Sequence, residues 1–302
     1  MVSVTQEARA EPLPRPTGRL LSGGLPLAWL GVVPFFLYVT LFLLLPALSL
    51  IVGAFQTESG SLTLANVNSI LQPQFTDAYK TSLELSAVTA LSGGILGLLV
   101  AYSVVREGAP SWLRAVFTTF SGVAANFAGI PLAFAFIATL GVTGIVTVFL
   151  RDRGIDIYSD GFTLYHFTGL AITYTYFQFP LMILIITPSL DGLRREWREA
   201  ATNLGASTWQ FWRMVGLPIL LPALLGAMVL LFGNAFAAYA TAYALVGGTL
   251  NLVPLLIGIS MSSDLFANPN LGDALAAGMI VIIAVAMLFY ALLMRRAARW
   301  RR

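Results

Sequence analysis

Apolar residues gather in six long windows along the chain, separated by polar segments. The windows fall at about 29–54, 80–105, 115–140, 166–190, 218–245 and 274–295. Each has the roughly twenty residues that a helix needs to cross about 30 Å of hydrocarbon. The pattern therefore predicts an all-α, polytopic membrane protein with six transmembrane helices.

The polar segments between the windows alternate in charge. One side receives most of the basic residues, namely Arg9, Arg15, Arg19, Arg106, Arg114, Arg194, Arg195, Arg198, Arg213, Arg295, Arg296, Arg299, Arg301 and Arg302. The other side receives Lys80, Arg151 and Arg153 against seven acidic residues, Glu58, Asp77, Asp152, Asp156, Asp160, Asp264 and Asp273. Because basic loops stay in the cytoplasm, we expect a multi-pass protein of the cell (inner, cytoplasmic) membrane with both termini cytoplasmic.

The segments outside the windows predict further features. Residues 1–24 form a polar, Pro-containing cytoplasmic leader without a signal-peptide pattern, ahead of a transmembrane domain at 25–302. Outer connections at about 55–79, 141–165 and 246–273 are long enough for a docking face. Within the last of them, "VPLLIGISMSSDLF" is too short to cross a bilayer and predicts an interfacial or re-entrant helix. Gly93 and Gly97 in "GGILG" predict close packing against another helix.

Composition supports the membrane assignment and excludes several kinds of chemistry. The 302 residues are 58% hydrophobic and 10% charged, and the mean hydropathy of +0.82 lies outside the range of soluble domains. The sequence contains no cysteine and one histidine, His166, so it offers no thiolate nucleophile and no Cys or His-rich metal site. It contains no phosphate-binding loop, and its one lysine is Lys80. We expect no catalytic residue, no metal and no nucleic-acid partner.

One cytoplasmic segment, "EAATNLGASTWQFWRMVGLP" (Glu199–Pro218), is polar although both neighbouring windows are apolar. The helix formers of "REWREAATNL" precede Gly205, which fits a left-handed helix cap. Ser207 and Gln210 match a capping box, which predicts a second short helix over "TWQFWRMV". The segment thus predicts two short helices joined at a glycine elbow. Trp209 and Trp212, three residues apart, are expected to share a face that meets lipid headgroups or a protein.

The spacing Glu-Ala-Ala, three residues, Gly205, nine residues, Val-Gly-Leu-Pro resembles the EAA motif of permease subunits of binding-protein-dependent type I ABC importers. Every motif position matches. The flanking "FQFPLMILIITPSLDGLRREWREAATNLGAS" and "LPILLPALLGAMVLLF" are also similar to this family, most closely to its polyamine, iron and phosphonate-type permeases. The resemblance runs from about Pro34 to the C-terminus.

The resemblance implies a coupling loop at about 191–217 that inserts into a groove of an ATPase subunit. The residues that it assigns to this contact are Glu199, Ala200, Ala201, Gly205, Ser207, Trp209, Leu217 and Pro218. Glu199 makes the polar contact, the alanines allow close approach, Gly205 is the elbow and Pro218 starts the next span. The implied partners are an ABC ATPase dimer that holds ATP and Mg, a second permease subunit (identical or paralogous) and an extracytoplasmic solute-binding protein. This chain itself then needs no cofactor.

Polar and aromatic residues within the windows are candidates for a translocation path: Asn126, Tyr174, Tyr176, Gln178, Asn234, Tyr239, Thr241 and Tyr243. The alternative for each is an interhelical hydrogen bond. Acidic outer loops and the resemblance favour a polyamine-like solute over iron or an aminophosphonate. Two other classes stay open. A secondary ion-coupled transporter needs charge at mid-membrane, for which Glu84 is the candidate, and the other is a membrane scaffold without transport.

Overall fold

A computed structural model describes residues 28–57, 59–106, 110–159, 161–262 and 269–299. Within these residues the chain is helical and contains no strand, only an isolated bridge between Gln56 and Leu62. The expected leader, residues 1–24, lies outside the described residues. The chain forms two compact units, one up to Leu48 and one from Ser49. The first unit contains α1 (Ala28–Val39), the π-helical turn η1 (Thr40–Leu44) and the start of α2 (Leu45–Ala54).

Six helical segments of the described chain have the length and apolar composition to cross a membrane, which confirms the predicted number. They are Gly31–Ala54, Pro73–Val105, Ile130–Arg151, Phe167–Asp191, Thr208–Phe236 and Pro269–Arg295. The third runs over Ile130–Arg151 instead of 115–140, and the fifth begins earlier than predicted, at Thr208. The second and sixth also begin earlier than predicted, at Pro73 and Pro269. Proline favours the first turn of a helix, and the polar residues that follow each proline lie outside the apolar windows. The expected short helix of the last outer connection is α13 (Val253–Ser262); residues 263–266 of that prediction lie outside the described residues.

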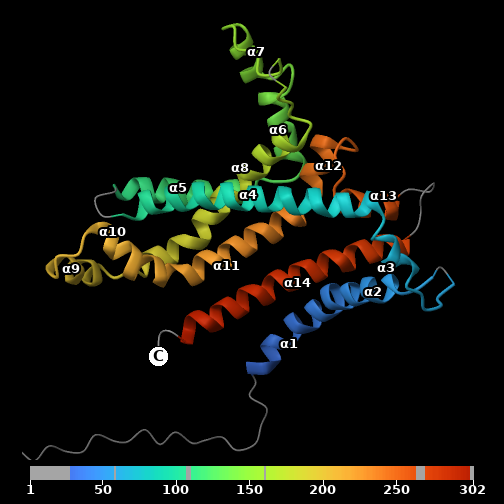
Figure 1. The fold of residues 1–302 in the computed structure, drawn as a ribbon, viewed down its shortest axis with the longest axis horizontal. Helices are drawn as coiled ribbons and strands as arrows, with labels where there is room; N and C mark the ends of the chain where they lie inside the picture. The colour runs from blue at the N-terminus through green and yellow to red at the C-terminus, as the bar shows by residue number, and fades with distance from the viewer. Residues whose placement is uncertain (1–27, 58, 107–109, 160, 263–268, 300–302) are drawn as a thin grey trace, which may run out of the picture. The chain divides into compact units, whose positions relative to one another are not determined.

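The second unit is a bundle centred on α4 (Pro73–Val105) and α8 (Phe167–Asp191), which lie along each other. Against this pair pack α5 (Ser111–Asn126) and α11 (Leu217–Phe236) (Figure 1). The remaining long helix, α14 (Pro269–Arg299), contacts α11, α13 and the short α3 (Ala65–Ser69).

Two of the predicted spans are interrupted, so the windows 115–140 and 218–245 are wrong as single helices. The first consists of α5 and α6 (Ile130–Leu140), followed by α7 (Ile145–Arg151). The second consists of α11 and α12 (Ala240–Val246). Gly129 breaks the first with a φ of 75°, a conformation that residues other than glycine rarely adopt. Hydropathy missed both breaks because the residues that form them are themselves mostly apolar.

The predicted packing role of Gly93 and Gly97 is confirmed at the α4–α8 contact. A Cβ atom on Gly93 would lie 2.4 Å from Cβ of Gln178, and one on Gly97 would lie 2.5 Å from Cβ of Met182. Beside them, Ser92 Oγ and Thr175 Oγ1 are 2.7 Å apart. Small residues therefore let the two central helices approach to backbone distance, as they do between other membrane helices.

We expect Gly93→Ala to destabilise the bundle by about 1–3 kcal/mol, because the added methyl overpacks the α4–α8 contact. The measurement is the thermal midpoint of the purified protein in detergent. Gly122→Ala is the matched control, since a Cβ there meets nothing within 4 Å and alanine favours a helix interior. A Gly93→Ala midpoint equal to that of the wild type would contradict the close packing.

Candidate coupling loop and translocation path

The predicted glycine elbow is present between α9 (Arg195–Asn203) and α10 (Thr208–Phe211). Gly205 has a φ of 78°, which confirms the expected left-handed cap. Its N–H donates to the carbonyl of Thr202 at 2.9 Å, and the N–H of Ala206 donates to the carbonyl of Ala201 at 2.9 Å. These two bonds form a Schellman motif, which satisfies the last carbonyls of α9.

The capping box of the second helix is also confirmed. The Ser207 N–H donates to Oε1 of Gln210 at 2.7 Å, and the Gln210 N–H donates to Oγ of Ser207 at 3.3 Å. Both helix ends at the elbow are therefore closed by bonds within the loop. The hydrogen bonds within the loop therefore set the direction of α9 without help from another protein.

The second helix continues into the membrane, so the expected start of the span at Pro218 is wrong. A π-helical turn, η2 (Trp212–Gly216), joins α10 to α11 without a break, and the candidate span begins at Thr208. Leu217 N–H bonds the carbonyl of Trp212 across this wider turn. Pro218 lacks an N–H and its ring crowds the preceding turn, and a π-helical turn relieves such crowding within a continuous helix. The same order, a π-helical turn before a proline, occurs at η1 and Pro46.

The two loop tryptophans differ, which corrects the expectation that they share a face. Trp209 is 73% exposed. Trp212 packs edge to face on Tyr102 of α4, with ring centroids 5.2 Å apart. Trp212 thus anchors the loop to the bundle, and Trp209 remains available at the surface.

Large apolar side chains project from the loop without cover in this chain. Leu204 is 87% exposed and Met214 is 71% exposed. Sequence reasoning did not select either residue, although an apolar residue beside the cap of a polar helix is a signal for contact with another surface. Glu199 lies on α9, and its Oε1 accepts from Nε of Arg195 at 2.8 Å. The loop therefore presents apolar groups beside an oriented ion pair.

The two helix breaks meet each other. The Gly129 N–H, in the break before α6, donates to Oγ1 of Thr241 at 2.9 Å. Thr241 lies in the first turn of α12, just beyond the second break, and its hydroxyl donates in turn to the carbonyl of Gly129 at 3.3 Å. Tyr174 of α8 donates its hydroxyl to the carbonyl of Ala238 in the second break at 2.7 Å. Backbone groups freed by the breaks thus find partners within the bundle.

The candidate path residues divide into two groups. Tyr174, Gln178 and Thr241 are buried and bond backbone groups, as expected for interhelical hydrogen bonds. Asn126, Asn234, Tyr239 and Tyr243 are exposed around the two breaks. The rings of Tyr239 and Tyr243 stack with centroids 5.4 Å apart, whereas Tyr176 packs against Phe136. The second group is the one that offers polar and aromatic surface.

Ion pairs occur at both ends of the described chain's helices, which the sequence predicts to lie on opposite sides of the membrane. At the end of α7, Arg151 Nε lies 3.7 Å from Oδ2 of Asp156. Burial raises the pKa of the Tyr158 phenol, whose hydroxyl donates to the carbonyl of Leu140 at 2.8 Å. At the opposite end of the bundle, Arg114 of α5 pairs with Asp191 of α8. The ends of α5 and α8 on the predicted cytoplasmic side are therefore joined directly.

The protein-family model described as "Binding-protein-dependent transport system inner membrane component" matches residues 93–301. Similar curated proteins include the sulfate transport system permease protein CysT of Salmonella typhimurium, 29% identical over 70% of this chain and 72% of that protein. Another is the spermidine/putrescine transport system permease protein PotB of Haemophilus influenzae, 25% identical over 84% of this chain and 90% of that protein.

Solved structures of two transporters share the fold. A chain of a bacterial ABC transporter for import of the acidic polysaccharide alginate has a TM-score of 0.70 at 20% identity, covering 89% of this chain and 95% of that one. A chain of the MetNI methionine ABC transporter, in an inward-facing conformation, has a TM-score of 0.55 at 17% identity, covering 75% of this chain and 98% of that one. The all-helical permease fold expected from the sequence is thereby confirmed.

We expect Tyr174→Phe to destabilise the protein by about 1–3 kcal/mol, because it leaves the partly buried carbonyl of Ala238 without this partner. Thermal unfolding in detergent measures the effect. Tyr243→Phe is the matched control, since that tyrosine is 57% exposed. Equal midpoints for the two variants would show that the break does not depend on the Tyr174 bond.

Proposed function

The chain belongs to the family of inner membrane components of binding-protein-dependent transport systems, and on this premise we propose that segment Glu199–Pro218 couples an ATPase to solute import. The protein is a permease subunit of an ABC importer. We propose that it assembles with an ATPase dimer, which binds ATP and Mg, with a second permease subunit and with an extracytoplasmic solute-binding protein. This chain then holds no nucleotide and no cofactor of its own.

The observation that carries the coupling role is the continuity of α10, η2 and α11 from the loop to the second break. A push on the exposed part of the loop is transmitted along one helix to Phe236. The next residues, 237–239, contact Tyr174 through Ala238, and Thr241 contacts Gly129. ATP-driven closure of the ATPase therefore displaces the segment where both discontinuous helices meet, as alternating access requires.

Different residues of the loop make different contributions to docking. Leu204, Trp209 and Met214 supply apolar area for burial against the ATPase. Glu199, with Ala200 and Ala201 beside it, supplies the polar contact in a place that allows close approach. Gly205 and Ser207 set the direction of α9 relative to α10, while Leu217 and Pro218 lie where the lever enters the membrane.

For the solute, we propose a small polyamine-like cation. The exposed aromatic stack of Tyr239 and Tyr243 suits an organic ammonium, which binds aromatic faces. The exposed path candidates Asn126 and Asn234 are neutral, so they do not repel a cation. Sulfate is the second candidate because sulfate permeases are among the relatives; iron and an aminophosphonate remain alternatives.

The complex reconstituted in proteoliposomes with its solute-binding protein tests this proposal. We expect ATP-dependent uptake of radiolabelled spermidine that is stimulated by loaded binding protein, and a lower rate for Tyr239→Ala. Unlabelled sulfate should not compete. Uptake of sulfate without uptake of spermidine would contradict the polyamine proposal and favour sulfate. Uptake of either solute without ATP would indicate an ion-coupled carrier.

Gly205→Val should impair transport strongly. A β-branched residue at positive φ costs about 1 kcal/mol or more, and a Cβ at this site meets nothing within 4 Å in the chain, so the defect arises from the backbone or from the docked partner. Glu199→Ala should weaken ATPase retention by roughly 1–3 kcal/mol if its partner is left buried and unpaired. Transport rate and co-purification of the ATPase are the two measurements.

Thr202→Val is the control for the elbow variant, since it places an isosteric β-branched residue on the same helix at a position that the motif leaves free. Normal transport and normal ATPase content in Gly205→Val would remove the loop from the coupling mechanism.

The proposed orientation places both termini in the cytoplasm. An alkaline phosphatase domain fused after Arg302 should be inactive, and a green fluorescent protein fused there should fluoresce. A fusion after Ile155, in the outer segment beyond α7, should give the reverse. An active phosphatase at the C-terminus would show that the proposed orientation or the number of spans is wrong.

A further inference from the structure

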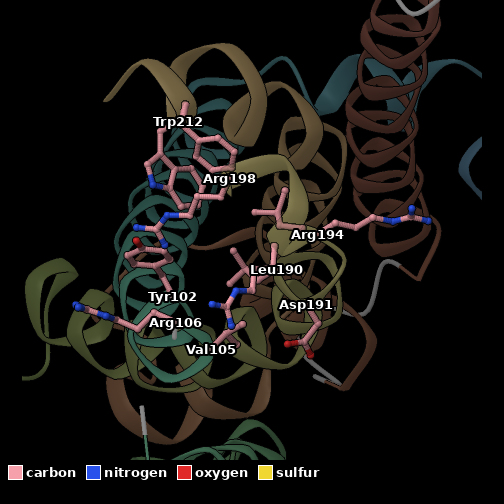
Figure 2. Close-up of a pocket in the computed structure, with 11 residues that line it drawn as sticks. Tyr102, Val105, Arg106, Leu190, Asp191, Arg194, Arg198 and Trp212 are labelled. Carbon is pink, nitrogen blue, oxygen red and sulfur yellow. The ribbon is translucent and has the colours of Figure 1, made fainter. Parts of the chain in front are cut away.

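A basic pocket lies behind the coupling loop, where the ends of α4 and α8 meet α9 and η2 (Figure 2). Its volume is about 190 Å³, and the residues that matter most are Tyr102, Arg106, Arg194, Arg195, Arg198 and Trp212. Figure 2 shows Arg198 reaching toward Tyr102, while Arg106 and Arg194 extend to opposite sides of the opening.

The pocket carries excess positive charge. Arg106, Arg194 and Arg198 have no carboxylate within ion-pair distance among the residues that the structure describes. The acidic residue in the lining, Asp191, pairs with Arg114. Arg198 therefore reaches over the pocket, whereas Arg106 and Arg194 lie at its rim, and arginines in such places favour a phosphate.

An apolar slot adjoins the basic pocket. Its volume is about 260 Å³, and it shares Tyr102, Leu190 and Trp212 with the pocket. Leucines and Ile186 complete its lining. Leu99, which lines the slot, is 58% exposed, so the slot opens at the surface of the bundle. A chain that enters between α4 and α11 therefore reaches the arginines without crossing a polar barrier.

We propose that the pocket and the slot together bind one anionic phospholipid, with its phosphate on Arg106 and Arg198 and an acyl chain in the slot. A soluble anion would leave the slot unused, whereas a phospholipid fits both chemistries at once. Tyr102 and Trp212 lie between the two parts, at the level where such rings meet headgroups. Basic pockets between helix ends at the cytoplasmic face bind anionic headgroups in this way.

A lipid in this place has a consequence for the loop. Arg106 ends α4 and Arg198 lies on α9, so a shared phosphate links the coupling loop to the bundle. Occupancy therefore holds α9 in one position relative to α4. The assignment to the cytoplasmic leaflet rests on the proposed orientation, but binding itself does not depend on transport or topology.

Native mass spectrometry of the full chain in a neutral detergent tests the site, with phosphatidylglycerol titrated against phosphatidylcholine. We expect one phosphatidylglycerol to be retained in preference to phosphatidylcholine. Arg106→Gln with Arg198→Gln should weaken its retention by about tenfold or more, since each arginine contributes to anionic-lipid binding. Leu99→Trp should weaken it by filling the slot at unchanged charge. The matched control is Arg151→Gln with Arg153→Gln, which removes the same charge from the opposite end and should retain the lipid.

Several results would overturn the proposal. Equal retention by the double pocket variant and its control would show that the arginines do not select the lipid. Competition by glycerol 3-phosphate at concentrations matching those of the lipid would make the pocket a soluble-phosphate site. Unchanged lipid retention together with loss of ATPase co-purification would assign the pocket to the ATPase interface. None of these outcomes decides the transport function, which the uptake assay of the assembled importer tests separately.

Discussion

Every backbone N–H and C=O of this chain that enters the membrane must find a partner within the protein, because hydrocarbon offers none. Long helices meet that demand along most of the bundle. The two breaks meet it by bonding each other and α8, through Thr241 with Gly129 and Tyr174 with Ala238. The elbow at Gly205, outside the apolar windows, is closed by a Schellman motif and a capping box. At the two breaks and at the elbow, specific bonds thus hold irregular backbone in one geometry.

Because the breaks and the elbow are held by hydrogen bonds, the continuous α10–η2–α11 helix can transmit a displacement from the loop to the second break. Trp212 fixes one end of the α10–η2–α11 helix against Tyr102, and the other end reaches the bonded breaks. The α4–α8 pair, packed through Gly93 and Gly97, offers a close-packed surface beside it. A loop that is closed by its own hydrogen bonds passes a displacement on to this helix instead of absorbing it.

The sequence predicted those features that depend on local chemistry. Gly205 and the Ser207–Gln210 pair specify the elbow within a few residues, so their conformation follows from the residues themselves. The number of spans follows from apolar length. Hydropathy missed the breaks at 127–129 and 237–239 because an apolar segment looks the same whether or not its helix is continuous. It also placed the fifth span too late, since a π-helical turn carries the helix through polar residues ahead of Pro218. The different surroundings of Trp209 and Trp212 depend on Tyr102, more than a hundred residues away in sequence, which local spacing does not reveal.

In the proposed complex, the ATPase covers the exposed apolar side chains of the coupling loop. The chain contains no cysteine, so the variant Leu204→Cys has a single thiol at the elbow. Its labelling rate with a water-soluble maleimide can be compared between the isolated permease and the complex with the ATPase, with Ile155→Cys as a control on the opposite side. We expect rapid labelling at position 204 in the isolated chain, protection in the complex, and no change at position 155. Equal labelling at position 204 with and without bound ATPase would contradict it.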